Sequence, residues 1–353
     1  MSSLMTVLLV GDVVGDTTDP LDGSLFDEDQ PSRAELTDLC TWLEEAGYRV
    51  ESYGKVGEFI RNPPKRRDNL LVFPLWRGGQ SRTRTAIIPA ICEGLGLPYV
   101  GGDAYVQSVC QDKSVSKVCA RLAGFEVPEE WPLRMLGEVD LFYPSRRLHP
   151  PFVVKPLFSA ASLGVSERSL CWDDRSAREA ARELFETGLG PVVCEEFIEG
   201  DEISLCFLEE TGTIQERCVA AYQDAAGQCP FRDRLFTFED KVKQKPAWSV
   251  GIYPRRLDKR TWEFATQLIR QLGKVDYMRI DGRLQGDRFV MIELTPDIHL
   301  GLQSAFLGGF SAAGYPPAAV LGRLAQASLS SQRASAKLFT GKTSWRPSFE
   351  GKA

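Results

Sequence analysis

The sequence predicts an α/β fold, and its first hundred residues carry the clearest evidence. Short apolar segments, typical of buried strands, alternate there with amphipathic segments typical of helices. Strands that alternate with helices indicate βαβ units and a parallel, doubly wound sheet. The 353 residues are enough for two or three domains. Apolar residues make up 43% of the chain and charged residues 25%, as in ordinary globular proteins.

Local signals place each element of this N-terminal region. Residues 6–10 are an apolar strand. Ser32 and Glu35 form a capping box that begins a helix, and Gly47 ends it. The motif GDVVGD at 11–16 has no third glycine and no helix behind it, which favours a strand-end turn over a dinucleotide site. The region continues with strands over 48–53 and 69–76 and a helix over 85–96.

The rest of the chain continues this alternation. A helix that carries Lys113 and Lys117 ends at Gly124, and two lysines four residues apart are by themselves typical of a solvated helix face. Alternating apolar and acidic residues over 191–208 predict a hairpin that turns at residues 199–201. The other elements are a strand over 152–155, helices over 176–188 and 261–273, and two strands over 276–294 joined at Gly286 and Asp287.

Composition argues against several classes of function. The formal net charge of -6 disfavours a nucleic-acid partner. The sequence has no run of 18 or more apolar residues, the length that a membrane-spanning helix needs. The N-terminus has no basic leader and no small-residue cleavage site, so we expect it to form the first strand of a sheet. Nine cysteines without a C-x-x-C pair indicate reduced, mostly buried thiols, and we therefore expect a cytoplasmic protein. With only two histidines, His149 and His299, histidine-based metal or triad chemistry is nearly excluded.

The segment 151–166, PFVVKPLFSAASLGVS, predicts a phosphate-binding loop. An apolar strand ends there in Lys155, and a buried lysine is unfavourable unless an anion pairs with it. The residues that follow are small, among them Ser159, Ser162 and Gly164. Because little side-chain bulk covers their backbone amides, these amides can fold over phosphate oxygens while the lysine supplies charge.

Two acidic residues lie on neighbouring predicted strands in the second half of the chain. Asp281 and Glu293 are embedded in the apolar segments RID and MIEL, where a buried acid needs a cation or hydrogen-bond donors. Pairs of this kind commonly hold Mg²⁺ against the phosphates of a nucleotide. Backbone groups of Glu196 to Ile198 could read an adenine edge, and an acid could take the ribose hydroxyls.

The order of these segments resembles the ATP-grasp superfamily and, within it, the D-alanine–D-alanine ligase group. A lysine-bearing helix, a V-K-P strand with a small-residue loop, EEFIEGDE and then RID…IEL follow one another between about residues 70 and 325. The resemblance implies an ATP-grasp fold: an N-terminal parallel-sheet domain and two α+β lobes that enclose ATP. The expected domains are an N-terminal domain over 1–105, a central lobe with a phosphate lid over 106–192, a C-terminal lobe with the Mg²⁺ site over 193–330, and a flexible basic tail over 331–353.

The resemblance also implies roles for the residues that match the family's motifs, with ATP and Mg²⁺ as cofactors. Arg279 and Lys241 are the expected catalytic residues: the arginine would steady the acyl-phosphate transition state, and the lysine would contact a phosphate. Glu195 matches the adenine-side glutamate and Glu202 the ribose-binding one. The expected ATP-binding residues are Lys113, Lys155, Ser159, Ser162, Glu195, Glu196, Ile198, Glu202 and Lys241, and the expected metal ligands are Asp281, Glu293 and Thr295.

Several positions depart from the family pattern. Thr295 replaces the asparagine that follows the second metal acid, so its hydroxyl or the nearby Asp297 would have to take over. Ala161 and Val242 replace a serine and a tyrosine that receive amino-acid substrates, and Arg84 stands where an acid is expected. These losses argue that neither substrate is simply D-alanine.

The same comparison gives expectations for the substrates. Arg77, Arg82 and Arg84 lie in a loop that would face the acyl site. They would hold an acidic or multiply carboxylated donor, because guanidinium groups suit carboxylates, but a solvated basic loop explains them equally well. Ser304 retains a serine that binds the acceptor's carboxylate. The expected substrate residues are Arg77, Arg84 and Ser304.

The sequence therefore predicts an ATP-dependent ligase that activates a carboxylate as an acyl phosphate and joins it to an amine or amino acid, releasing ADP and phosphate. We expect small-molecule substrates from peptide or specialised-metabolite biosynthesis, other than those of D-alanyl-D-alanine synthesis. The resemblance implies a homodimer. Two alternatives stay open. One is a ligase that activates a vinylogous acid or enol oxygen, as in mycosporine-type synthesis. The other is a nucleotide-binding regulator without turnover, which Thr295 and the missing substrate residues would favour.

Overall fold

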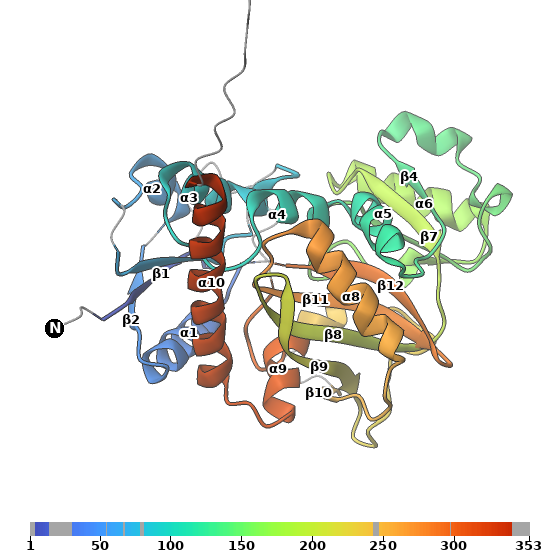
Figure 1. The fold of residues 1–353 in the computed structure, drawn as a ribbon. Helices are drawn as coiled ribbons and strands as arrows, with labels where there is room; N and C mark the ends of the chain where they lie inside the picture. The colour runs from blue at the N-terminus through green and yellow to red at the C-terminus, as the bar shows by residue number, and fades with distance from the viewer. Residues whose placement is uncertain are drawn as a thin grey trace, which may run out of the picture.

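The computed structural model describes residues 4–13, 30–53, 55–65, 68–77, 81–242, 247–296 and 298–340. Their strands form three sheets (Figure 1). One sheet is parallel and N-terminal, and the other two are antiparallel. This arrangement confirms the predicted α/β fold. None of the described helices is long and apolar enough to cross a membrane.

The N-terminal sheet has the strand order β2-β1-β3, and helices cover both of its faces. Alternate residues of β1 point to opposite sides, so that Leu9 packs with α1 and Leu8 packs with α2 and α3. The capping box is present: the Ser32 hydroxyl accepts the Glu35 N–H at 3.1 Å, and Glu35 Oε2 accepts the Ser32 N–H at 3.0 Å. The elements are β1 (Thr6–Val10), α1 (Arg33–Glu45), β2 (Arg49–Ser52), α2 (Val56–Arg61), β3 (Leu70–Pro74), a 3-10 turn (Arg84–Ala86) and α3 (Ile87–Leu95).

A four-stranded antiparallel sheet, in the order β4-β7-β5-β6, follows in the chain. Helix α6 covers one of its faces, where Ala177, Ala181 and Leu184 join the core of this sheet. Strand β7 crosses the expected boundary between residues 192 and 193. The elements are β4 (Glu130–Leu133), β5 (Phe152–Pro156), β6 (Leu170–Cys171), α6 (Asp174–Glu186), β7 (Val192–Glu196) and 3-10 turns at Leu136–Leu141, Pro144–Arg146 and Glu167–Ser169.

The third sheet is five-stranded and antiparallel, in the order β10-β9-β8-β11-β12. On one face α4, α5 and α8 share its core, and on the other α9 and α10 join it to the N-terminal sheet and α1 (Figure 1). The elements are α4 (Ala104–Gln111), α5 (Lys113–Ala123), β8 (Asp201–Glu210), β9 (Thr213–Gln223), α7 (Phe238–Val242), β10 (Ser249–Ile252), α8 (Lys259–Leu272), β11 (Tyr277–Gln285), β12 (Arg288–Thr295), α9 (Ala305–Ala312) and α10 (Pro317–Thr340).

Two sequence expectations differ from this architecture. The predicted hairpin over 191–208 is wrong, because β7 pairs with β4 and β5 whereas β8 pairs with β9 and β11. The turn at 199–201 is instead a crossing between two sheets, where a Cβ on Gly200 would meet the Leu284 carbonyl oxygen at 2.6 Å. Helix α10 also continues to Thr340, ten residues into the segment assigned to the basic tail.

The predicted burial of most of the cysteines is confirmed. All nine are thiols, and those at positions 92, 110, 171, 194, 206 and 218 are buried. Most of them pack in the apolar cores of the three sheets, where a thiol behaves as a small hydrophobic side chain.

Glu35, at the start of α1, gives the stability of the fold a pH dependence. Burial raises its pKa, but the hydrogen bond and charge of His299 and the Ser32 N–H outweigh this effect and lower the pKa to about 2. A carboxyl whose pKa is lower in the folded chain stabilises the fold above about pH 4.5, and this contribution is lost as the pH falls toward 2.

We therefore expect Glu35→Gln to reduce stability at pH 6 and to flatten its decline between pH 4.5 and 3. Denaturant midpoints measured across this range test the prediction. Glu45→Gln, an exposed change on the same helix, is the matched control. Parallel curves for Glu35→Gln and the unaltered chain would show that this carboxyl does not contribute.

Candidate functional site

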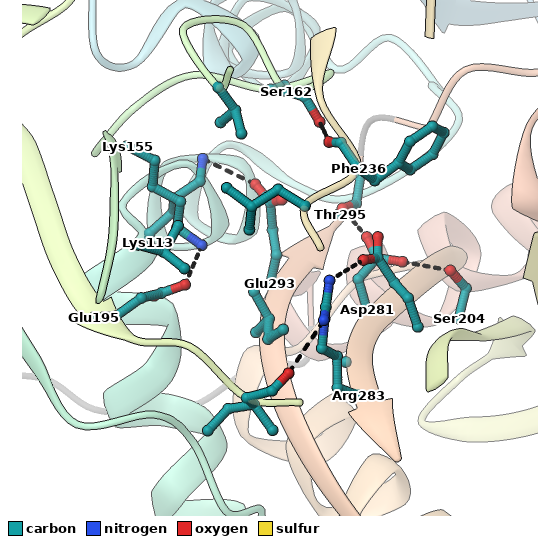
Figure 2. Close-up of a pocket in the computed structure, with 18 of the residues that line it drawn as sticks. Lys113, Lys155, Ser162, Glu195, Ser204, Phe236, Asp281, Arg283, Glu293 and Thr295 are labelled. Atoms are coloured by element: carbon teal, nitrogen blue, oxygen red, sulfur yellow. Dashed lines mark hydrogen bonds and ion pairs between the residues drawn. The ribbon is translucent and has the colours of Figure 1, made fainter. Parts of the chain in front are cut away.

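A cavity between the four-stranded and five-stranded sheets contains the predicted nucleotide and metal residues. All thirteen of them line it, together with other residues from β5, β8, β9, β11 and β12. These thirteen residues are Lys113, Lys155, Ser159, Ser162, Glu195, Glu196, Ile198, Glu202, Lys241, Arg279, Asp281, Glu293 and Thr295. Figure 2 labels Lys113, Lys155, Ser162, Glu195, Asp281, Glu293 and Thr295 among them.

The loop after β5, residues 157–166 and here named the lid loop, forms one wall of the cavity. Ala161 and Ser162 have φ angles of 52° and 59°, a left-handed conformation that costs a non-glycine residue about 1 kcal/mol. The Ser162 hydroxyl donates to the Phe236 carbonyl at 2.8 Å, which attaches the lid loop to the segment before α7 (Figure 2). The strained backbone is thus held by a contact between the two lobes.

A buried charge cluster lies behind the lid loop. Glu195 accepts from Lys117 at 2.6 Å and from Lys155 through its other oxygen, while Lys117 also reaches Glu130 at 2.7 Å. Burial raises the pKa of Glu195, but the two ammonium groups outweigh it and lower that pKa. Burial disfavours a charged Lys117, yet the two carboxylates raise its pKa above the ordinary value. The pKa of Lys155 is lowered, chiefly by burial.

This cluster corrects one sequence interpretation and adds contacts to another. Lys113 and Lys117 are only 4% and 1% exposed, so they do not form a solvated helix face. Both oxygens of Glu195 are engaged by lysines, so this glutamate holds two cationic groups in place, and its adenine-side role stays a prediction. Sequence reasoning assigned no role to Lys117. Its four-residue spacing from Lys113 places both lysines on one helix face but does not report on its partners.

The two predicted metal acids lie opposite each other. Asp281 on β11 pairs in register with Glu293 on β12, beside a β-bulge between residues 281 and 282. Asp281 accepts from the Ser204 hydroxyl at 2.6 Å and from the Thr295 hydroxyl at 3.2 Å. Glu293 lies 2.9 Å from Lys113 Nζ. Burial raises the pKa of Glu293, but nearby lysines, Lys113 first, lower it to about 2.

These oxygens fit a magnesium ion. Mg²⁺ is usually bound through one or two carboxylates together with substrate phosphates, so it does not need a cage made by the protein alone. Within the described ranges no group of three or more His, Cys, Asp or Glu side chains could hold a metal. Asp297, the predicted alternative to Thr295, lies outside the described residues.

Two cationic side chains complete the cavity near the acids. Arg279 donates from Nε to both oxygens of Asp281 at 2.7 and 2.9 Å. Burial lowers the pKa of Arg279, but Asp281 outweighs it and raises that pKa, so the guanidinium keeps its charge. Lys241 Nζ lies 4.9 Å from the centre of the Phe236 ring, and its pKa is lowered by burial and then by Arg279.

Arg283 is a cavity residue that the sequence interpretation missed. Its Nη2 donates to Glu202 Oε2 at 2.9 Å, and its guanidinium lies 4.7 Å from the centre of the Phe197 ring. Arg279, Asp281 and Arg283 alternate along β11 and therefore point to the same face. That spacing was a signal from which Arg283 could have been found.

The three predicted substrate residues do not line the cavity. Arg77 Nη2 donates to the Ile298 carbonyl at 2.8 Å, and Arg84 Nε donates to the Arg77 carbonyl at 2.7 Å. Both arginines are buried, so the interpretation as a solvated basic loop is wrong for them. Ser304 occupies the N-cap position of α9 without a side-chain capping bond, and no partner for its buried hydroxyl exists among the described residues.

Comparisons with known proteins identify the relatives of this chain. No protein-family model matches it. It is 32% identical over 117 residues to the D-alanine–D-alanine ligase A of Bacillus cereus, which covers 33% of this chain and 37% of that protein. It is 29% identical over 191 residues to the D-alanine–D-alanine ligase B of Chromobacterium violaceum, which covers 54% of this chain and 57% of that protein. The matches thus span about a third to just over half of these curated relatives.

The fold extends the likeness to nearly the whole chain. The structure of the D-alanine–D-alanine ligase from Bacillus anthracis complexed with ATP superposes with a TM-score of 0.67 at 17% identity, covering 94% of this chain and 100% of that one. The sheets and lobes described above are therefore those of the ATP-grasp fold. In sequence over part of its length, and in fold over nearly all of it, the chain is thus similar to the D-alanine–D-alanine ligases.

Proposed function

We propose that the protein binds ATP with Mg²⁺ and uses it to join a carboxylate to an amine, releasing ADP and phosphate. The proposal rests mainly on the arrangement of charged side chains in one cavity. Lys113, Lys155 and Lys241 line it together with the facing pair Asp281 and Glu293. Cationic side chains beside a carboxylate pair suit a metal-bound triphosphate. The similarly folded B. anthracis ligase is complexed with ATP, which supports the same ligand here.

The reaction would proceed in two balanced steps. A carboxylate oxygen of the donor attacks the γ-phosphorus of ATP, and the bond from that phosphorus to the β-phosphate bridging oxygen breaks to release ADP. The amine nitrogen of the acceptor then attacks the carbonyl carbon of the acyl phosphate, and phosphate leaves as the nitrogen loses a proton. Both steps need positioning and charge neutralisation more than a protein nucleophile.

The chain's own residues would divide these tasks. Lys113 and Lys155 would hold ATP phosphates, and the amides of the lid loop would cover them. Asp281, Glu293 and Thr295 would hold Mg²⁺, which would neutralise phosphate charge during transfer. Arg279 would face the carbonyl oxygen of the acyl phosphate.

The substrates would differ from those of the named relatives. Ala161 and Val242 occupy positions where the ligase group carries a serine and a tyrosine for amino-acid substrates. Arg77 and Arg84 bind backbone carbonyls, so they would shape the acyl side through the loops they hold. The predicted role of Ser304 in binding an acceptor carboxylate would require its hydroxyl, which is buried and has no partner among the described residues, to become accessible.

A screen of acid and amine pairs tests the proposal. Purified protein with Mg-ATP should release ADP and phosphate only when both substrates are present, and mass spectrometry should detect the amide. Each substrate alone is the control. Release of AMP and pyrophosphate would refute the acyl-phosphate route. ATP binding without turnover for any pair would favour the alternative of a nucleotide-binding regulator. The observation that supports this alternative is Thr295, which stands where the ligase group has an asparagine.

Removing the Thr295 hydroxyl is expected to weaken Mg²⁺ binding. The hydroxyl donates to Asp281 at 3.2 Å, and losing such a support of a metal ligand typically lowers metal affinity about tenfold or more. Thr295→Val should therefore raise the Mg²⁺ concentration that half-saturates ATP binding by about tenfold. Calorimetry with ATP at varied Mg²⁺ measures it. Thr295→Ser and Thr295→Asn, which keep an oxygen, should stay close to the unaltered protein, and an unchanged Mg²⁺ requirement in Thr295→Val would exclude the role.

A further inference from the structure

Arg283 joins four acceptors at one end of the cavity. Besides Glu202, it donates to the carbonyl oxygens of Ile198 at 3.2 Å, Arg232 at 3.1 Å and Arg234 at 2.7 Å. These acceptors come from the crossing between the two sheets, from β8, and from the loop before α7. One side chain therefore connects three separate segments around the cavity.

The guanidinium is buried, which makes this arrangement energetically demanding. Its side chain is 3% exposed, and a buried cation is stable only when its donors are satisfied and a counter-charge is present. The three carbonyls satisfy donors, and the Glu202 carboxylate supplies the charge. The planar guanidinium group has five N–H donors at fixed angles and can donate to four acceptors at once. A lysine ammonium group has only three donors and cannot.

The pair also fixes the direction of Glu202. Arg283 holds Oε2, and the Glu202 side chain is 25% exposed and lines the cavity. This exposure leaves the carboxylate able to accept a hydrogen bond from the hydroxyl of a ligand in the cavity. Without the guanidinium, the carboxylate could rotate or turn toward solvent.

We propose that Arg283 is a positioning residue that orients Glu202 toward a ribose hydroxyl of the nucleotide. This inference rests on the proposed ATP binding. Arg283 need not touch the nucleotide: four of its five donors are occupied by protein acceptors, and it acts through the carboxylate it holds. Selectivity for ribose over deoxyribose nucleotides then depends on both members of the pair.

A double-mutant cycle tests the proposal. The dissociation constants of Mg-ATP, Mg-2′-deoxy-ATP and Mg-3′-deoxy-ATP are measured by calorimetry for the unaltered protein, Arg283→Met, Glu202→Gln and the double variant. One of the deoxy analogues lacks the hydroxyl that would donate to the charged Glu202. The unaltered protein should therefore prefer ATP about tenfold over that analogue. Arg283→Met should reduce this preference to about twofold or less. The double variant should match Glu202→Gln, since both changes act on one contact.

The outcomes separate this inference from the proposed function. If Arg283→Met keeps the full ribose preference and only lowers the unfolding midpoint, Arg283 is a structural residue and the inference is overturned. If Arg283→Met does not fold, Arg283→Lys takes its place: it keeps the charge without the fork and should also lose the preference. An unaltered protein that binds ATP and the deoxy analogues equally overturns this inference alone, whereas one that binds no ATP overturns the proposed function as well.

Discussion

Replacing Arg279 by methionine is expected to lower kcat about a hundredfold or more and to leave ATP affinity nearly unchanged. In the proposed reaction, negative charge builds on the carbonyl oxygen when the amine adds to the acyl phosphate. A preorganised donor in a cavity that excludes water is worth roughly 3 kcal/mol to such an oxyanion. Arg279 lines the cavity, its guanidinium is held by Asp281, and its charge is maintained by that carboxylate.

Two further variants make this result specific. Asp281→Asn should weaken Mg-ATP binding as well as turnover, because it removes a proposed metal ligand. Arg279→Lys keeps a positive charge but not the fork, and it should recover only part of the lost rate. Single-turnover kinetics with saturating ATP, together with calorimetry, separates the two effects. Weaker ATP binding with an intact kcat in Arg279→Met would identify the arginine as a structural partner of the acids.

The metal pair shows how far sequence could predict the site. The two strands and their turn at Gly286 and Asp287 were predicted, and so was the closeness of Asp281 and Glu293. Beyond the turn, however, Gly282 pairs with Met291, and continuing that register would place Asp281 opposite Ile292. The bulge after Asp281 shifts the register by one residue, which puts Glu293 opposite it on the same face. No local signal in the sequence specifies this bulge.

Pairing between distant segments was the main source of error. The segment 191–208 does contain two strands, as its alternating pattern indicated. The two strands belong to different sheets, however, and do not pair with each other. Alternation specifies which side chains share a face and does not specify the neighbouring strand. The lobe-crossing path at Gly200, and with it the place of Glu202 beside Arg283, could therefore not be read from the pattern.

Lys117 shows the same limit of sequence-based prediction for a buried charge. Its carboxylate partners stand 13 and 78 residues away in the sequence, and no helical periodicity reports on them. A lysine on an amphipathic helix is normally solvated, so the local pattern favoured the wrong environment. Only the folding of β4 and β7 against α5 brings Glu130 and Glu195 to this ammonium group.

Lys117→Met is accordingly expected to have the largest effect on stability, lowering the free energy of unfolding by about 3–5 kcal/mol. The change removes the cation that Glu130 and Glu195 share, and leaves Glu195, whose side chain is 3% exposed, with Lys155 as its remaining partner. A buried carboxylate that loses such a partner must either bear an uncompensated charge or take up a proton.

Denaturant unfolding at pH 7 measures this loss. Lys259→Met is the matched control, because Lys259 also pairs with a glutamate, at 3.1 Å, but its side chain is 90% exposed. Its loss should change stability by about 0.5 kcal/mol or less. Adding Glu195→Gln to Lys117→Met should recover part of the stability by removing the stranded charge. If Lys117→Met were as stable as Lys259→Met, the cluster would be no stronger than a surface pair. Lys117 could then not be the residue that holds Glu195, and through it Lys155, in place beside the lid loop.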